Sequence, residues 1–372
     1  MSNKEILKLI SPPGDTIQET LDEIGMSQAE LAERMGRPKE KINDIIKGRE
    51  PITTHTAFQL EKVLNIPASF WLNREKEYRR RLYELEQQQR MEEALGWLDN
   101  FPLGAMKKMG ILPKTRKKVE LVDLLLHFFN IASPKQWETI YIAKEVSIAF
   151  RISLANTKDP YAISVWLRKG EVDADSLDLA EFDKKRFRNM LREVKELAYE
   201  FPADFAIRLQ QMCAKTGVAV VYTPPLPKAP ISGAVRWIRH HPLIQLSGRY
   251  KTDDHFWFTF FHEAAHILLH GKKDVFLEEV KGTFIDQAKE EEANRFAARF
   301  LLKEAEFQKI LGNDILTKEM ILDYSRKFRT PPGVIIGRLQ HEGVLRFSEG
   351  NNLRRKINLF DDEGKMIANQ HS

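Results

Sequence analysis

The chain has 372 residues, of which 42% are hydrophobic and 30% are charged, and its formal net charge is +5. This length indicates two or three domains rather than one core, and no apolar run reaches the ~18 residues that a membrane-spanning helix needs. The first residues lack the apolar stretch of a signal peptide, and the single cysteine, Cys213, cannot form an internal disulfide. We therefore expect a cytoplasmic protein without a membrane segment, whose mild basicity permits nucleic-acid binding but does not establish it.

The first predicted elements are short helices between residues 12 and 73. Ser27 to Glu30 forms a capping box, in which the serine caps a helix and the glutamate reaches back to it. This helix ends at Gly36, and a second short helix follows and ends at Gly48. Two short helices around a turn are typical of the helix-turn-helix unit, whose second helix enters the major groove of DNA, although plain helical bundles contain such pairs too.

Residues 12–73 resemble the Cro/cI-type (XRE) helix-turn-helix of the HigA-like antidote proteins. The resemblance is carried by PPGDTIQETLDEIGMSQAELAERMG, INDIIKGREPITTHTAFQLEKVLNIPASFWLN and the residues between them. It implies a DNA-binding domain over residues 1–73, built as a five-helix type of bundle, with double-stranded operator DNA as its partner. A homodimer is expected, since one such unit makes few contacts with DNA.

The same resemblance implies which side chains meet the DNA. Gln28 would contact a phosphate, and four side chains would face the groove. These are Arg37, Lys39, Lys41 and Asn43. Phosphate contacts would position the domain, and the groove-facing residues would specify sequence. Glu40 and Asp44 count against strong binding, because carboxylates near phosphates weaken affinity.

A long polar linking helix is predicted over residues 74–95, which contain strong helix formers and neither Gly nor Pro. Residues 96–204 are predicted to form a helical middle region. Basic residues concentrate at Arg74–Arg81 and at Lys107–Lys118. Such charge runs are more often solvated faces than sites.

The pattern changes after residue 204. Short β-branched stretches at residues 217–222, 231–237 and 243–246 predict strands, and helical signals return from Asp253 onward. The tail from residue 347 to 372 is polar, and we expect it to be loosely ordered.

A helix capped by Asp253 and ending at Gly271 contains the motif HEAAH at residues 262–266. Residues four apart lie one turn apart on a helix, so His262 and His266 can reach one metal ion. A zinc ion held there would acidify a water molecule, and Glu263 would act as the general base when that water attacks a peptide carbonyl. The competing interpretation is a histidine pair on a core-facing helix.

A catalytic zinc needs a third protein ligand and an open position. The metzincin pattern fails, because Leu269 and Lys272 stand where Gly and His are required. The segment Glu290–Leu302 offers three glutamates, and at 100° per residue Glu290 lies nearest the centre of its apolar face, whereas Glu291 and Glu292 lie farther round.

The expected site therefore holds one zinc ion per chain. Its three expected ligands are His262, His266 and Glu290. Asn294, one turn after Glu290, is expected to brace that carboxylate. His270 is expected to interact with the helix dipole, and His240 and His241 are expected to be surface residues.

Residues 205–345 are similar to the ImmA/IrrE family of metallo-endopeptidases. The similarity is carried by HEAAHILLHG and EEEANRFAARFLL, and also by GVAVVYTPPLP and PPGVIIGRLQHEG on either side. In that family the domain is a zinc peptidase, known members cleave helix-turn-helix repressors, and the glutamate of the ExxAN motif falls on Glu290 here. A zincin-like peptidase domain is implied over residues 205–346. The expected fold class is mainly α with a small β-sheet (α+β).

The two resemblances together imply a DNA-binding transcriptional regulator or antitoxin-like protein that carries a zinc-dependent metallo-endopeptidase. Its further partner would be a small toxin or a repressor substrate. The alternative is a non-enzymatic HigA-type antitoxin or repressor, whose zincin-like domain is a scaffold that binds a toxin or a signal. The motif favours the enzyme, because a scaffold has no need of Glu263. A zinc nuclease is disfavoured, because the sequence offers no further Asp/His clusters.

Overall fold

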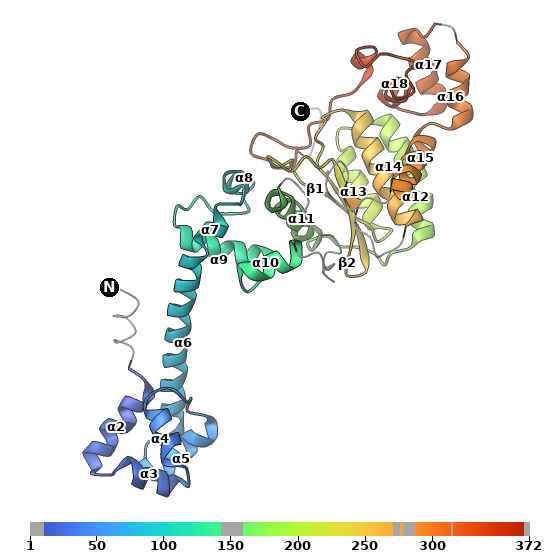
Figure 1. Ribbon diagram of the computed structural model, residues 1–372. Helices are drawn as coiled ribbons and strands as arrows, with labels where there is room; N and C mark the ends of the chain where they lie inside the picture. Colours follow the sequence, from blue (N-terminus) through green and yellow to red (C-terminus); the bar gives the residue numbers. More distant parts are fainter. Residues whose placement is uncertain (1–10, 143–158, 271–275, 278–286, 314, 368–372) are drawn as a thin grey trace. The chain divides into compact units, whose positions relative to one another are not determined.

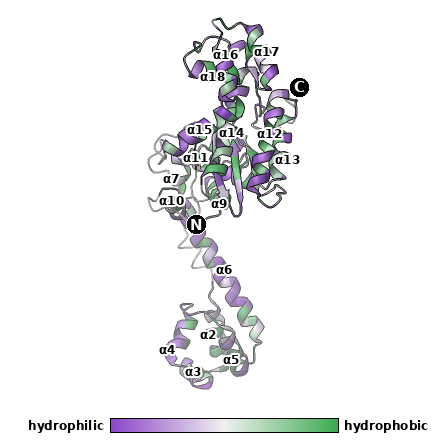
Figure 2. Cartoon of the chain, turned by 90° about the vertical axis from the view of Figure 1, so that its right-hand side faces the viewer, coloured by the Kyte–Doolittle hydropathy of each residue, from purple (hydrophilic) through white to green (hydrophobic). Residues whose placement is uncertain are grey.

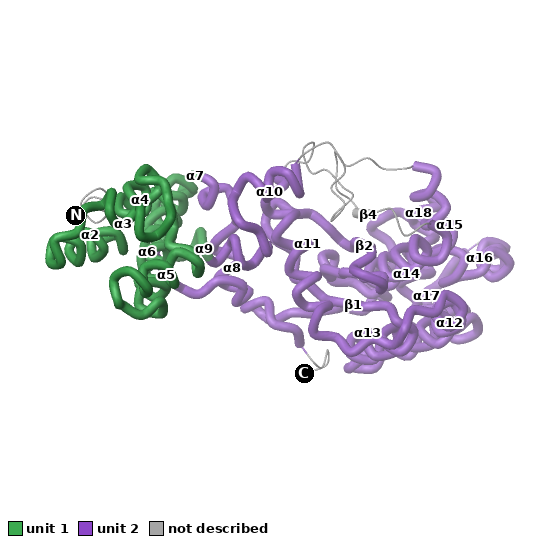
Figure 3. The backbone as a smooth tube through the Cα atoms, turned by 90° about the horizontal axis from the view of Figure 1, so that it is seen from below, with its two compact units in different colours: residues 1–96, 118–123 green, residues 97–117, 124–372 purple. Residues whose placement is uncertain are grey.

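The computed structural model describes residues 11–142, 159–270, 276–277, 287–313 and 315–367. The chain divides into two compact units (Figure 3). The first comprises Met1–Gly96 and Lys118–Asp123, and the second comprises Trp97–Lys117 and Leu124–Ser372. Among the described helices, none combines the length and the apolar composition that crossing a bilayer requires.

Five helices make up most of the first unit (Figure 1). They are α2 (Pro13–Ile24), α3 (Gln28–Met35), α4 (Lys39–Ile46), α5 (Thr54–Leu64) and α6 (Ala68–Glu93). Their apolar faces enclose one core that includes Leu21, Leu31, Ile45, Leu60 and Trp71. The expected five-helix bundle is therefore confirmed.

The turn between α3 and α4 follows from local sequence. The hydroxyl of Ser27 accepts a hydrogen bond from the backbone N–H of Glu30 at 3.1 Å, and Gly36 ends α3 in the left-handed region at φ 62°. The expected second half of the capping box is replaced by another contact, because the Glu30 carboxylate pairs with Arg34 at 2.7 Å. A charged partner one turn away competes well with a backbone N–H.

Helix α6 begins at Ala68, earlier than the expected linking helix, and its first turns belong to the bundle. Trp71 is fully buried, and its indole donates a hydrogen bond to the carbonyl of Ile66 at 3.2 Å. Hydrophilic residues dominate the rest of the helix (Figure 2). The predicted basic run here is offset by carboxylates, since Arg80 pairs with Glu77 at 2.7 Å and Arg79 with Glu75 at 2.6 Å.

The second unit starts with helices that pack around aromatic side chains. The short α7 (Leu95–Leu98) spans the boundary between the units, and α8 to α11 follow, of which α9 has its first half in the first unit. The bounds of these four are Leu103–Lys108, Lys118–Phe129, Pro134–Tyr141 and Pro160–Ala174. Trp137 is fully buried and stacks on Tyr161, with ring centroids 4.3 Å apart.

A four-stranded sheet lies in the second unit, in the order β1-β3-β2-β4. The strands are β1 (Ala219–Tyr222), β2 (Gly233–Ile238), β3 (His241–Leu246) and β4 (Phe276–Leu277). β1 is parallel to β3, and β2 is antiparallel to both β3 and β4. The expectation of a mainly α protein with a small sheet is therefore confirmed.

Helices cover both faces of this sheet. Successive residues of a strand point to opposite faces, so neighbouring residues of β3 contact helices on different sides. On β3, Ile244 and Leu246 join the core that contains helix α14 (Asp253–Leu269). The intervening Gln245 donates a hydrogen bond to the carbonyl of Trp166 in α11 at 2.6 Å. The same core as α14 includes residues of α12 (Lys184–Glu200) and α13 (Phe205–Ala214).

Four further helices and one 3-10 turn follow the sheet. They are α15 (Gln287–Leu301), α16 (Glu304–Leu311), α17 (Lys318–Phe328), α18 (Pro332–His341) and η1 (Asn351–Leu353). The polar tail, which we expected to be loosely ordered, packs onto the core as far as it is described. Ile357 and Leu359 are 1% and 3% exposed, and their burial outweighs the polar composition of their neighbours.

The tail also contacts the first residues of α14. Asp253, which the sequence predicted as a cap, is the first residue of the helix after the N-cap Thr252. Its fully buried carboxylate accepts from the backbone N–H of Arg355 at 3.0 Å and from Nε of the same residue at 2.9 Å. The adjacent Asp254 pairs with Arg354 at 2.8 Å. Two consecutive ion pairs therefore join the tail to this helix.

Candidate metal centre

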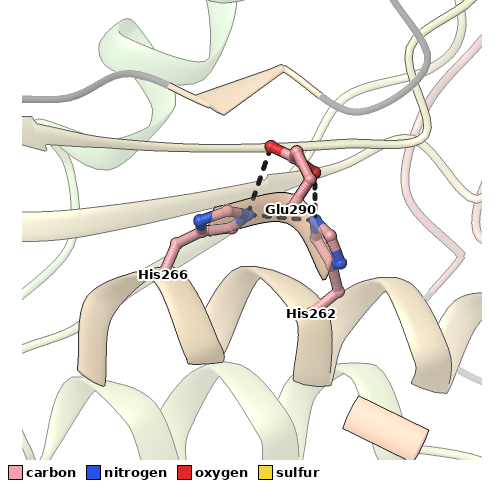
Figure 4. A group of neighbouring side chains, drawn as sticks. All are labelled: His262, His266 and Glu290. Carbon is pink, nitrogen blue, oxygen red and sulfur yellow. Dashed lines mark hydrogen bonds and ion pairs between the residues drawn. The ribbon is translucent and has the colours of Figure 1, made fainter. Parts of the chain in front are cut away.

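The structure brings together the three side chains that the sequence proposed as ligands (Figure 4). His262 and His266 lie one turn apart on α14, and Glu290 lies in the first turn of α15. The two Nε2 atoms are 3.0 Å apart, and the Glu290 carboxylate lies 3.2 Å from Nε2 of His262 and 3.6 Å from that of His266. Both histidines are buried, whereas Glu290 is partly exposed.

These distances lie within about 0.3 Å of those in a tetrahedral metal site. Zinc binds imidazole nitrogen and carboxylate oxygen at 2.0–2.2 Å, so the ligand atoms of a tetrahedral site lie roughly 3.3–3.5 Å apart. Two imidazoles and one carboxylate also make up a donor set that leaves a fourth position open. These three residues could therefore hold one metal ion.

Asn294 fixes the orientation of the first histidine. We expected its amide to brace Glu290, but its Oδ1 lies 2.9 Å from Nδ1 of His262. An amide oxygen only accepts, so Nδ1 carries the proton and Nε2 keeps its lone pair for a ligand. Asn294 is therefore placed to set the tautomer that a metal ligand needs.

A second chain of contacts, which sequence reasoning missed, orients His266. Nδ1 of His266 lies 2.8 Å from Nδ1 of His270, and Nε2 of His270 lies 3.2 Å from the Glu292 carboxylate. With Glu292 accepting from Nε2 of His270, and Nδ1 of His270 accepting from Nδ1 of His266, the lone pair of His266 remains on Nε2. The signal was the spacing of four residues between the two histidines, which places them on one face of the helix.

Burial keeps His266 in its metal-binding form. Loss of hydration lowers the pKa of His266 to about 2, and the neighbouring His262, His270 and Lys289 lower it further. The imidazole is therefore neutral at ordinary pH, and a neutral ring nitrogen is the ligand that a metal requires.

Glu263 follows His262 on α14 and packs against the sheet. Its side chain has no exposed surface and lies against Gly233 of β2. A Cβ at Gly233 would come within 2.7 Å of the Glu263 carboxylate and 2.5 Å of the Thr259 methyl group. The glycine therefore allows β2 to approach the helix beside the candidate general base.

The remaining histidines of the prediction lie apart from this group. His240 is exposed, and Nδ1 of the half-buried His241 lies 3.0 Å from the carbonyl oxygen of Gly217. Neither belongs to the group of potential ligands found among the described residues.

In the first unit, the residues proposed to meet DNA lie on α3, α4 and the turn between them. Gln28 and Asn43 are brought together, since the Asn43 amide donates to Oε1 of Gln28 at 3.4 Å. Gln28 in turn donates to Gln18 at 2.6 Å. Arg37 donates to the Gln59 side chain at 2.7 Å, and Lys39 is exposed.

Ion pairs offset much of the charge on α4. Lys41 pairs with Glu50 at 2.8 Å, and Asp44 pairs with Arg49 at 2.7 Å. Arg49 also donates to Asn43 at 3.1 Å. Sequence reasoning did not single out Arg49 and Glu50, which follow the end of α4 at Ile46 and pair with side chains of that helix.

Two family models match the chain in the regions just described. The helix-turn-helix model matches residues 17–71, and the IrrE N-terminal-like domain of peptidase family M78 matches residues 213–340. The HTH-type transcriptional regulator YbaQ of Escherichia coli K12 is 30% identical over 97 residues, which cover 26% of this chain and 84% of YbaQ. The regulator YddM of the same strain is 34% identical over 61 residues, which are 16% of this chain and 65% of YddM. The chain therefore belongs to the HTH-type transcriptional regulators, and it joins a helix-turn-helix domain to a domain of the M78 peptidase family.

Proposed function

We propose that the chain is a transcriptional regulator of the antitoxin type whose C-terminal domain is a zinc-dependent metallo-endopeptidase. The observation that carries the proposal is the convergence of His262, His266 and Glu290, with Glu263 buried beside them. The domain boundaries that we propose are residues 1–73 for DNA binding, 74–95 for the linking helix, 96–204 for the middle region and 205–346 for the peptidase, with a tail over 347–372.

His262, His266 and Glu290 would hold the zinc ion, and Asn294 and His270 would keep both Nε2 lone pairs directed at it. A zinc ion bound there polarises a carbonyl group and makes water more acidic. The Glu263 carboxylate would accept a proton from the attacking water and pass it to the amine that leaves the peptide. Burial strengthens these interactions, because charges interact more strongly where water is excluded.

The substrate that we propose is a peptide bond in a regulatory protein, such as a helix-turn-helix repressor or a partner toxin. The DNA partner would be an operator bound by a homodimer, with contacts from Gln28, Arg37, Lys39, Lys41 and Asn43.

A second candidate is a scaffold that binds a toxin or a signal without cleaving a peptide. Full burial of Glu263 and near-complete burial of both histidines favour this alternative, because a substrate must reach the groups that act on it. A domain that opens only when a signal binds would explain both the burial of these groups and the presence of a complete set of metal ligands.

The two candidates are separated by Glu263→Gln, which keeps the shape of the side chain and removes its basicity. The peptidase predicts one zinc per chain by mass spectrometry in both the wild type and this variant, with metal lost in His262→Ala and Glu290→Ala. It also predicts that cleavage of helix-turn-helix proteins falls ~100-fold or more in Glu263→Gln, the usual contribution of a general base. Repression by Glu263→Gln at wild-type strength, with no cleavage by either protein, supports the scaffold.

A further inference from the structure

One basic segment of the second unit remains unexplained by either proposed site. Residues 107–118, KKMGILPKTRKK, contain six Lys and Arg and no Asp or Glu. The segment joins α8 to α9 (Figure 1).

The fold holds this segment in a defined shape. Met106 and Leu112 are buried, and the backbone N–H of Leu112 donates to the carbonyl of Met106 at 3.3 Å. The Lys107 ammonium donates to the carbonyl of Thr115 at 2.6 Å. The cations between and beyond these anchors are therefore displayed on an ordered loop.

Three of these cations are exposed and uncompensated. Lys108, Arg116 and Lys117 are exposed, and none of them has a side-chain ion pair with any described residue. Lys117 is also the N-cap of α9, and no side chain caps that end of the helix. A cation there faces the positive end of the helix dipole, which disfavours it. Ion pairs within the described part of the chain do not account for these three charges. This favours an external anion as their partner.

The DNA-binding domain supplies little positive charge of its own. Between residues 11 and 73, ten carboxylates outnumber seven Lys and Arg side chains, which gives a net charge of −3. On its reading helix, the Lys41 ammonium is already paired with Glu50. Most of the affinity of a protein for DNA comes from cations that replace the counterions of phosphate. An acidic domain of this kind needs cations from elsewhere in the chain.

We propose that Lys108, Arg116 and Lys117 form a second contact with the phosphate backbone of duplex DNA, in addition to the helix-turn-helix. The proposal rests on DNA binding by the first unit. The contact carries no sequence information, so it raises affinity equally for operator and for unrelated DNA.

The test compares full-length wild type with the triple variant Lys108→Gln, Arg116→Gln and Lys117→Gln. The probes are fluorescein-labelled duplexes, one from directly upstream of the coding sequence of this chain and one of mixed sequence. The matched control replaces three exposed cations in another basic run. These are Lys184, Lys185 and Arg188, each changed to Gln. The control lowers the net charge by the same amount, but its run directly follows six carboxylates between residues 171 and 183.

Fluorescence anisotropy as a function of salt gives the number of phosphate contacts. Each contact contributes about 0.9 to the slope of log affinity against log salt, so the triple variant should lose about 2.7 from that slope. When the salt concentration rises from about 50 to 200 mM, the affinity of wild type should therefore fall by a factor that is about 40 times larger than the factor for the triple variant. The change should be the same on both duplexes.

A slope for the triple variant equal to that of wild type would overturn the proposal. An equal loss in the control variant would also overturn it, since net charge rather than a local contact would then be the cause. Arg37→Ala separates this result from failure of DNA reading by the first unit. It should reduce the preference for the upstream duplex while leaving affinity for the mixed sequence nearly unchanged.

Discussion

Removing Arg355 should make the second unit unfold more easily, because it leaves the buried Asp253 without its ion-pair partner. Asp253 is fully buried and accepts two hydrogen bonds from Arg355. The guanidinium of Arg355 also donates to the carbonyls of Tyr199 and Ala198, at 3.0 and 3.2 Å. In Arg355→Ala, the carboxylate keeps its contacts with the backbone N–H groups of residue 355 and of Asp254, but it loses its counter-charge.

The expected loss at pH 7 is about 4 kcal/mol of the free energy of unfolding. Breaking one side of a buried pair typically costs 3–5 kcal/mol. The electrostatic part has an upper limit, because Asp253 can instead take a proton. Protonating a carboxyl whose unfolded pKa is about 3.9 costs about 1.36 kcal/mol per pH unit, or about 4 kcal/mol at pH 7.

The loss should shrink in acid. Burial already raises the pKa of Asp253 in the wild type, while Arg355 opposes that shift. A carboxyl with a raised pKa in the folded state contributes its full stability below its unfolded pKa, and loses it as the pH rises. Without Arg355 the pKa rises further, so the electrostatic loss should fall from an upper limit of about 4 kcal/mol at pH 7 to an upper limit of about 1.5 kcal/mol at pH 5.

Urea unfolding followed by tryptophan fluorescence at both pH values measures this difference. The control is Arg208→Ala, since Arg208 pairs with Asp204 at 2.8 Å but is about half exposed. It should cost less than about 1 kcal/mol. Adding Asp253→Asn to Arg355→Ala should recover part of the loss at pH 7, because an amide needs no counter-charge. The reasoning is refuted if Arg355→Ala costs as little as the control, or if its cost is the same at both pH values.

Three further outcomes follow from the geometry. His270→Ala should weaken zinc binding ~10–100-fold in a chelator competition, by releasing His266 from its orientation; unchanged affinity would show that the contact is incidental. Gly233→Ala should push Glu263 aside and lower peptide cleavage while leaving zinc content intact, so a variant with full activity would contradict the role given to this contact. Gly14→Ala should lower the melting temperature of the first unit, because its Cβ would overlap the carbonyl of Ile46; circular dichroism that shows no shift would disprove this.

Local periodicity made much of the candidate site predictable. The spacing of four residues placed His262 and His266 on one face of a helix, because helical geometry depends only on chain position. The angle of Glu290 on its own helix identified it among three neighbouring glutamates, and the structure brings it to both histidines. The fold class, the helix-turn-helix domain and the M78 peptidase-family domain are confirmed, since the motifs that identify both domains lie within continuous segments.

The partners of side chains on different elements could not be predicted in this way. Asn294 meets His262 rather than Glu290 because of the way α15 lies against α14, which no periodicity encodes. Glu30 left its predicted capping role for Arg34, since two alternatives of similar energy were open to it. The tail was expected to be loosely ordered because it is polar, yet Ile357 and Leu359 pack into a core formed by distant segments.

The pair between Asp253 and Arg355 has a consequence for how the protein is made. The two residues are 102 positions apart in the chain, so a ribosome that adds ~5–20 residues per second needs roughly 5–20 s to deliver the second after the first. During that interval the helix with the HEAAH motif carries a carboxylate with no counter-charge. Among the described residues, the core shared by helices α2 to α6 extends no farther along the chain than Leu72. Each newly synthesised molecule thus gains its DNA-binding part first and finishes its second unit later.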